Sequence, residues 1–326
     1  MSDPDRIEQI GTTALLWDAV ERWRVLVRLR RDQFERLRTE RPDPDAYWAR
    51  RAANFFEAVR RRQDPGPFVR EVVATCRDAE SHGPRWATGA EPPPATVLDV
   101  GGGFGAVAIP VAERGHRVTV IEPHAAMLEL LDRWATEARV REQLRVIAAG
   151  WPEAGASVEP HDVVVCSHVL YPIEDVVPFV RALVAATRHA CLITLRMAGI
   201  EQTPDELFRE LHGEDRVPQP GFGDLCAVLA AAGIPFGVTT YETDAAWSYA
   251  DLDEAEALLS EGLLVSDRPD ARARVRDWAA GALQPSQGRL ALPDRRVLAG
   301  VATIRPAPSA AHRARPSYPA GEAWEG

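Results

Sequence analysis

One short segment, an apolar strand that runs directly into a glycine-rich turn, constrains the fold of this chain more than any other. It is residues 97–105, VLDVGGGFG, and a helix-compatible run follows at 106–114. Glycines at alternate positions let the backbone adopt positive φ and approach a ligand closely. The helix behind the turn directs its free N–H groups and positive dipole end toward that ligand. The segment therefore predicts a small-molecule site at the first turn of a doubly wound α/β sheet.

The rest of the chain after residue 95 alternates between apolar strands and helices. The strands are predicted at 96–100, 117–121, 144–148, 162–166, 190–195, 237–242 and 295–304. The helices between them are predicted at 106–114, 125–135, 177–186 and 222–233, with two more helical pieces at 253–263 and 270–283. Continuous Val, Ile and Leu runs separated by helices are typical of a parallel sheet that is covered on both faces.

The flanks suggest three further parts. Residues 12–62 are largely helical by their 3–4 spacing, with a break at 42–45, and 68–79 form another helix. We therefore expect an N-terminal helical cap at 1–94 and an α/β core at 95–305. The core includes a helical insert at 245–294, before the last strand. The segment 306–326 is poor in core residues and is expected to be a disordered tail.

The composition excludes several classes of protein. A net charge of −10 and a pI near 5.4 argue against a polyanion binder, because phosphate binding needs a basic surface. Four scattered cysteines without a CxxC pair indicate free thiols in a reducing cytoplasm. We expect no signal peptide, no membrane span and no metal site, since no apolar run is long enough and no ligand cluster has metal spacing.

The acid that precedes the glycines narrows the choice of ligand. Asp99 lies two residues before Gly101, and further glycines follow at 103 and 105, which gives D-x-G-x-G-x-G. A dinucleotide fingerprint, G-x-G-x-x-G, fits only loosely. The pattern resembles motif I of the class I S-adenosylmethionine-dependent methyltransferases. The run EPHAAML at 122–128 and the segment HDVVVCSHVLY at 161–171 resemble two further motifs of that family, and the resemblance covers residues 95–200.

The resemblance implies a fold, a cofactor and a set of binding residues. The sheet would have seven strands, with 295–304 as an antiparallel last strand. S-adenosylmethionine would lie over the glycine turn, and Glu122 is placed to bind both ribose hydroxyls. Where the family often has an acid beside a glycine to bind the adenine, this chain has Gly150 and Trp151. That indole has two interpretations, stacking on the adenine or packing in the core. The expected cofactor-binding residues are Asp99, Gly101, Gly103, Gly105, Glu122, Pro123, Met127, Gly150, Trp151 and Ser167.

Candidate catalytic residues follow from the rule that ligands bind at the carboxyl ends of the strands. His168 is the first choice for a general base because an unperturbed imidazole titrates near neutral pH. Tyr171 is the second, and an aromatic core role is its alternative. Other side chains that could reach the site are Arg196, His212 and Glu214 on the following connection, and Trp247 and Tyr249 in the insert.

The sequence favours methyl transfer to a small-molecule acceptor on O, N or C, in secondary or cofactor metabolism. Residues 166–169, CSHV, stand where nucleic-acid amino methyltransferases usually carry D/N-P-P-aromatic. Two alternatives stay open: a protein of this fold that binds the cofactor for other chemistry or regulation, and a nicotinamide-dependent oxidoreductase. The aromatic segment 47–56 is open to two interpretations, a lid over the cofactor or a helix that packs on the sheet or in a homodimer.

Overall fold

The computed structural model describes residues 4–38, 52–53, 55–57, 59–60, 64–81, 93–198, 203–244, 247–293 and 296–306, with backbone alone at 4–18 and 244. The predicted break at 42–45 and the predicted tail beyond 306 lie outside these residues, as does most of the aromatic segment 47–56. Within the described part of the chain, no helix combines the length and apolar character that a membrane span needs.

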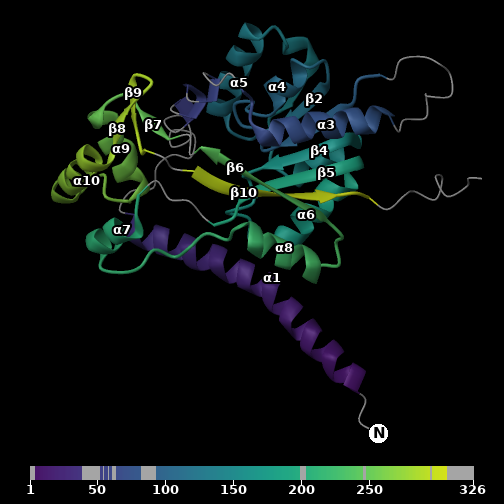
Figure 1. Ribbon diagram of the computed structural model, residues 1–326, viewed down its shortest axis with the longest axis horizontal. Coiled ribbons are helices and arrows are strands. Elements are labelled where there is room, and N and C mark those ends of the chain that lie inside the picture. The colour runs from purple at the N-terminus through teal and green to yellow at the C-terminus, as the bar shows by residue number, and fades with distance from the viewer. Residues whose placement is uncertain are drawn as a thin grey trace, which may run out of the picture.

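A seven-stranded sheet runs through the centre of the described chain (Figure 1). Its order is β3-β2-β1-β4-β5-β10-β6, and β10 runs antiparallel to both of its neighbours while the other pairs are parallel. The doubly wound sheet with an antiparallel last strand is thus confirmed. The strands are β1 Thr96–Val100, β2 Arg117–Ile121, β3 Leu144–Ile147, β4 His161–Ser167, β5 Thr187–Arg196, β6 Gly237–Asp244 and β10 Arg296–Ile304.

Helices cover both faces of the sheet. One buried cluster joins α1 Pro4–Leu37, α6 Val176–Ala185 and α8 Phe222–Ala231 to the strands. The other joins α3 Pro67–Ser81, α4 Ala108–Ala112 and α5 Ala125–Glu137 to the opposite face. Helix α4 is shorter than the predicted 106–114, because the glycine turn continues through Val107 before the helix begins. Two short 3₁₀ helices, Arg141–Gln143 and Glu153–Ser157, flank β3.

Helix α1 is fixed to the core along its C-terminal half. Trp23 is fully buried, and its indole N–H donates to the Ile173 carbonyl at 2.7 Å. Gln33 donates to the Asp215 carbonyl at 2.7 Å and accepts the Val217 N–H at 2.8 Å. Figure 1 shows α1 passing along α8, with its N-terminal end projecting away from the sheet.

A separate unit with its own core, distinct from the N-terminal helices, lies beside the sheet (Figure 1). It contains α7 Asp205–His212, α9 Leu252–Gly262, α10 Pro269–Ala282 and a small sheet of β7 Ser248–Tyr249, β9 Arg289–Ala291 and β8 Gln284–Ser286. The insert predicted as helical therefore also holds strands. The predicted connection that carries His212 and Glu214 also contains a helix, because residues 205–212 form α7. Leu207, Phe208 and Leu211 form one buried face of α7, and Gly213 ends that helix with a left-handed φ of 71°.

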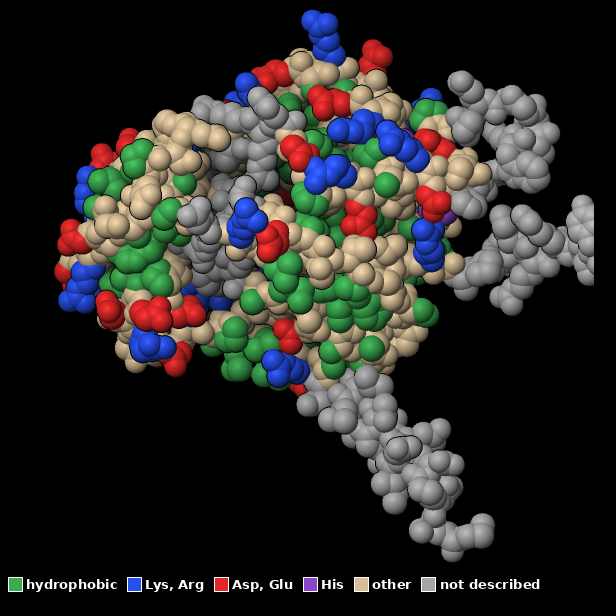
Figure 2. Space-filling view, viewed as in Figure 1, with side chains coloured by type: hydrophobic (Ala, Val, Ile, Leu, Met, Phe, Trp, Pro, Cys, Tyr) green, Lys and Arg blue, Asp and Glu red, His purple; other side chains and the backbone are tan. Residues whose placement is uncertain are grey.

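Acidic and basic side chains are interspersed on the face shown in Figure 2. Surface ion pairs are common among the described residues, and Arg276, for example, pairs with Asp253 at 2.6 Å and with Glu256 at 2.9 Å. Such exposed pairs contribute little stability individually, about 0–1 kcal/mol. The described surface on this side therefore has the mixed charge of an ordinary globular protein.

Candidate cofactor and acceptor site

The glycine turn folds back over the end of β2. The N–H of Gly101 donates to the Ile121 carbonyl at 2.8 Å, and the N–H of Gly105 donates to Gly102 at 2.9 Å. The φ angles of Gly101, Gly103 and Gly105 are 70°, 54° and 92°. All three therefore adopt the left-handed conformation that favours glycine.

The three glycines differ in what surrounds them. A Cβ on Gly101 would lie 2.4 Å from Val169 Cγ2, and one on Gly105 would lie 2.5 Å from Leu131 Cδ1. A Cβ on Gly103 would meet only Met127 Sδ, at 3.8 Å. Close packing within the protein thus requires glycine at 101 and 105. Gly103 instead faces space that a ligand can occupy, with Met127 at its side.

Two buried carboxyl groups lie beneath this turn. Glu122 follows β2, and its two carboxylate oxygens accept the N–H groups of Gly103 and His124, each at 3.0 Å. Asp99 on β1 is 1% exposed, and its Oδ2 has no hydrogen-bond partner among the described residues. Burial, and next the negative charge of Glu122, raise the pKa of Asp99 to about 7, while the Ala108 N–H opposes the shift.

The remaining predicted cofactor residues are spread around the same end of the sheet. Pro123 is exposed directly after Glu122, and Ser167 is the half-buried last residue of β4, opposite Thr194 on β5. The indole of Trp151 packs into the core cluster of α6, and its N–H points to the Phe179 carbonyl at 3.4 Å. These contacts favour the core interpretation of Trp151 over stacking on an adenine.

Gly150, which precedes that indole, is half-buried, and its own Cβ position has room. The nearest atom to a Cβ there would be Glu153 Oε2 at 3.5 Å, an ordinary contact distance. The structure therefore gives no packing reason for glycine at this position.

His168 and Tyr171 form one hydrogen-bonded unit after β4. His168 has a φ of 60°, and its backbone N–H donates to the Thr194 carbonyl at 3.0 Å. The Tyr171 hydroxyl accepts the backbone N–H of Arg196 at 3.0 Å and lies 2.9 Å from His168 Nδ1. Since the oxygen already accepts one hydrogen bond, its own hydrogen is available for Nδ1. This network assigns the hydrogen of the neutral imidazole to Nε2.

His168 was chosen as a base because an unperturbed imidazole titrates near neutral pH, but its surroundings perturb this imidazole. Its side chain keeps an exposed face, yet desolvation by the surrounding protein, and next the positive charge of Arg196, lower its pKa to about 3. These surroundings disfavour the charged imidazole, so they weaken the reason for choosing His168 as a general base. At neutral pH it is an uncharged ring whose Nε2 donates. Burial likewise raises the pKa of Tyr171.

Only some of the other candidates lie near this unit. Arg196 ends β5, and its guanidinium carbon lies 4.8 Å from the centre of the Trp247 ring. Tyr249 is buried in the core of the unit that contains α7, α9 and α10. His212 Nε2 lies 2.7 Å from the Leu263 carbonyl, and Glu214 pairs with Arg36 at 2.6 Å, so both have structural contacts away from the sheet.

An aromatic cluster lies at the glycine turn, and it includes Phe56 of the segment 47–56, for which the sequence leaves open a cofactor lid or a packing helix. Phe104 lies within the turn, and its ring is 5.7 Å from that of Phe56, which is fully buried. Phe56 also contacts Trp134 of α5 at 5.8 Å, and the Arg133 guanidinium lies 4.6 Å from its ring centre. The available signal was the aromatic residue inside the glycine run. Phe56 thus packs directly on the turn.

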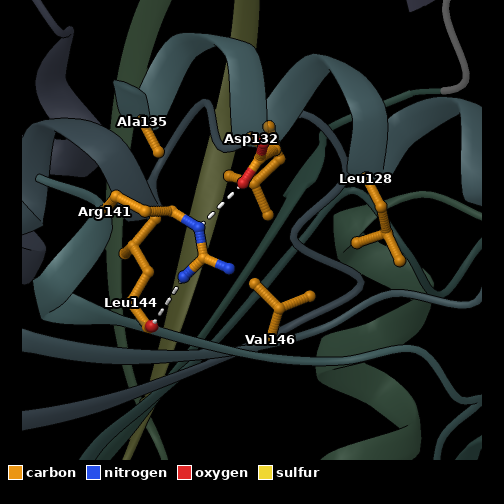
Figure 3. Close-up of a pocket in the computed structure, with 7 residues that line it drawn as sticks. Leu128, Asp132, Ala135, Arg141, Leu144 and Val146 are labelled. Atoms are coloured by element: carbon orange, nitrogen blue, oxygen red, sulfur yellow. Dashed lines mark hydrogen bonds and ion pairs between the residues drawn. The ribbon is translucent and has the colours of Figure 1, made fainter. Parts of the chain in front are cut away.

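A cavity of about 200 Å³ opens elsewhere, between α5 and β3 at the edge of the sheet (Figure 3). The Arg141 side chain crosses it and donates to Asp132 at 2.7 Å. None of the predicted site residues lines it; the lining residues are Leu128, Leu131, Asp132, Ala135, Arg141, Leu144 and Val146. Within the described residues no group of three or more His, Cys, Asp or Glu side chains could hold a metal ion.

The strand order and the buried acids at the glycine turn define a Rossmann-like methyltransferase fold. Residues 97–190 match the model of a methyltransferase domain family, and that segment includes β1, β2 and the turn after β4. The matched segment is thus a methyltransferase domain, and S-adenosylmethionine is its cofactor. No curated protein matches the chain.

Solved structures of low identity resemble the chain. A methyltransferase of Geobacter sulfurreducens with S-adenosylhomocysteine is 16% identical over 79% of this chain and 98% of its own, with a TM-score of 0.45. One of Thiobacillus denitrificans is 18% identical over 78% and 97%, with a TM-score of 0.42. Magnesium protoporphyrin IX methyltransferase of Synechocystis is 17% identical over 61% and 91%, with a TM-score of 0.42.

Proposed function

We propose that this chain transfers a methyl group from S-adenosylmethionine to a small molecule bound over the carboxyl ends of β4 and β5. The observation that carries the proposal is the pair of buried acids beneath an open glycine turn. An unpartnered carboxylate oxygen on Asp99 fits a ligand with positive charge, and the cofactor carries an ammonium and a sulfonium. The room beside Gly103 fits the close approach of that ligand to the backbone.

Glu122 would hold the ribose. Each of its oxygens accepts one backbone N–H, which leaves each with a lone pair for a hydroxyl hydrogen. The same two hydrogen bonds hold the glycine turn and the residue after Pro123 in place. Glu122 thus both shapes the cradle and faces the ligand. The proposed cofactor site is completed by Met127, Gly101, Gly105, Gly150 and Ser167. Trp151 supports it from the core.

The bound cofactor supplies an electrophilic methyl group, so the protein must hold an acceptor in line with it and exclude water. His168 would contribute a hydrogen-bond donor through Nε2, with Tyr171 fixing the ring. An imidazole with a pKa near 3 is a weak base at neutral pH. The site therefore suits an acceptor whose nucleophile is already ionised, or an amine or carbon nucleophile that needs no strong base.

The acceptor would belong to secondary or cofactor metabolism, with no nucleic acid or membrane as partner. The four free cysteines, three of them buried, support a reducing, cytoplasmic environment. We also propose that residues 1–94 cap the core at 95–305 and that their helices supply a homodimer contact, which sedimentation equilibrium would test.

Calorimetry with S-adenosylhomocysteine and with NAD tests the cofactor assignment. Binding of the first and not the second is expected, and Glu122→Ala should weaken it about tenfold or more, as for the loss of charge-assisted hydrogen bonds. Binding of NAD instead would favour an oxidoreductase. Tight S-adenosylhomocysteine binding without methyl transfer across a broad acceptor panel would favour the alternative of non-methylating chemistry or regulation.

A further inference from the structure

We propose that Phe56 and Phe104 are positioning residues for the cofactor, because their contact fastens the Phe56 segment to the glycine turn and holds that turn in the form that binds S-adenosylmethionine. The Phe56 segment is the described part of residues 52–60. This inference rests on the proposed cofactor site and names the residues that hold its turn in place. Binding of the cofactor and docking of the segment would then favour each other.

The ring of Phe56 contacts both the glycine turn and α5. Its centre lies 5.7 Å from the Phe104 ring and 5.8 Å from the Trp134 ring, with interplanar angles of 86° and 85°. Edge-to-face pairs of this kind are a favourable arrangement of aromatic rings. Phe104 and Trp134 also lie 6.4 Å apart, and Phe56 is fully buried. The three rings therefore form one cluster that joins three segments distant in the sequence.

The Phe56 segment is docked on α5 by more than one side chain. The Arg133 guanidinium of α5 lies 4.6 Å from the centre of the Phe56 ring, where it interacts with the aromatic face. Arg60, one turn further along, pairs with Glu137 at 2.9 Å. Ala52, one turn before Phe56, is 1% exposed. The segment thus presents a buried face over two helical turns, with charged contacts at its edge.

The face of α5 that holds this cluster also supports the ligand side of the turn. Met127, Leu131 and Trp134 lie one turn apart on that helix. A Cβ on Gly103 would lie 3.8 Å from Met127 Sδ, and one on Gly105 would lie 2.5 Å from Leu131 Cδ1. The turn around residues 103–105 therefore rests on a single helix face.

Phe104 connects this packing to the backbone that approaches the ligand. It directly follows Gly103, whose N–H donates to Glu122 at 3.0 Å and whose φ is 54°. The ring of Phe104 contacts Phe56, while the neighbouring glycine faces the space that a ligand can occupy. A shift of the ring would therefore move the backbone of the cradle. Because such coupling is reciprocal, a bound cofactor should also stabilise the docked segment.

Amide hydrogen exchange and calorimetry test this inference with the full chain. Saturating S-adenosylhomocysteine should slow exchange in the peptide that covers residues 52–60 by about tenfold. Phe104→Leu and Phe56→Leu should each weaken S-adenosylhomocysteine binding about tenfold, the scale of one or two aromatic pairs. Both variants should also lose the slowing of exchange at saturating ligand, which a purely structural role would leave in place. Leucine keeps most of the apolar volume, so the fold is preserved.

The double variant distinguishes a shared contact from two separate effects. If the two rings act through their contact, Phe56→Leu combined with Phe104→Leu should bind S-adenosylhomocysteine about as weakly as the weaker-binding single variant. If the two losses of affinity multiply instead, the rings act independently and the inference is overturned.

Phe208→Leu is the matched control, because Phe208 is also fully buried, and its ring lies 4.5 Å from that of His212 and 4.6 Å from the Arg216 guanidinium. It should lower stability yet keep both S-adenosylhomocysteine affinity and the slowing of exchange at 52–60. Unchanged binding by both single variants, or no effect of the ligand on exchange at 52–60 in the unsubstituted chain, overturns the inference and leaves the proposed function in place. No binding of S-adenosylhomocysteine by the unsubstituted chain overturns the proposed function and the inference with it.

Discussion

Asp99→Asn should remove a pH dependence from the stability of the ligand-free protein. The carboxyl of Asp99 is buried on β1 beside Glu122, and its pKa is raised to about 7 from an ordinary value of 3.8. The folded chain therefore binds this proton more tightly than the unfolded chain does. Stability from this group is full below about pH 4 and is lost as the pH rises toward 7.

The pKa shift sets the size of the effect. Each unit corresponds to about 1.4 kcal/mol, so the full difference between low and high pH is about 4 kcal/mol. Between about pH 5 and pH 8 the free energy of unfolding should fall by about 3 kcal/mol from this residue alone. Asparagine does not titrate, and its similar shape preserves the packing around Ala108 and Gly102, which lie next to the carboxyl.

Urea unfolding at about pH 5 and about pH 8 gives the change in the free energy of unfolding for each protein. The effect of Asp99 is the difference between these two changes. His116, His161 and His212 also have lowered pKa values because of burial, and they make stability rise with pH, but both proteins share them. Glu122→Gln should lower the pKa of Asp99 and reduce the slope without abolishing it. If the unsubstituted chain and Asp99→Asn show the same pH slope, the raised pKa is wrong.

Three more perturbations separate structural from functional roles. Gly101→Ala should destabilise the fold by about 2–4 kcal/mol through its clash with Val169, whereas Gly103→Ala should cost about 1–2 kcal/mol and chiefly weaken S-adenosylhomocysteine binding; calorimetry and urea unfolding separate the two effects. Tyr171→Phe should release the imidazole of His168 to both tautomers, which ¹⁵N NMR of the ring detects; a single tautomer in both proteins would refute the network. Phe56→Ala should cost about 3 kcal/mol or more in urea unfolding, and full retention of stability would contradict its packing on the glycine turn.

The elements that carry the cofactor were predictable because their signals are local. β1 and β2 begin and end where the apolar runs predict, since each run is bounded by polar residues or glycine. Asp99 lies one residue before the end of β1 and Glu122 directly after β2, and the two strands pair in parallel, so the proximity of these acids follows from topology alone. The reason why position 101 must be glycine was not predictable, because that reason is the side chain of Val169, which lies far along the chain.

The acceptor side was less predictable because it is built from contacts between distant segments. The apolar residues that form the buried face of α7 lie among charged residues in the sequence. Packing on α9 and α10 stabilises this helix. The role of His168 changed for the same reason. An isolated imidazole titrates near neutral pH, but here Tyr171 fixes its tautomer and Arg196 disfavours its charge.

These two sides of the site meet where Val169 packs beside Gly101. The turn after β4 therefore cannot move toward the cofactor without displacing the glycine turn, and binding on one side should order the other. A larger residue at 169 would press on Gly101, while Val169→Ala would leave a gap of two methyl groups there. Val169→Ala should thus weaken S-adenosylhomocysteine binding, although the residue carries no polar group. Unchanged S-adenosylhomocysteine binding by this variant would show that the contact does not position the glycine turn.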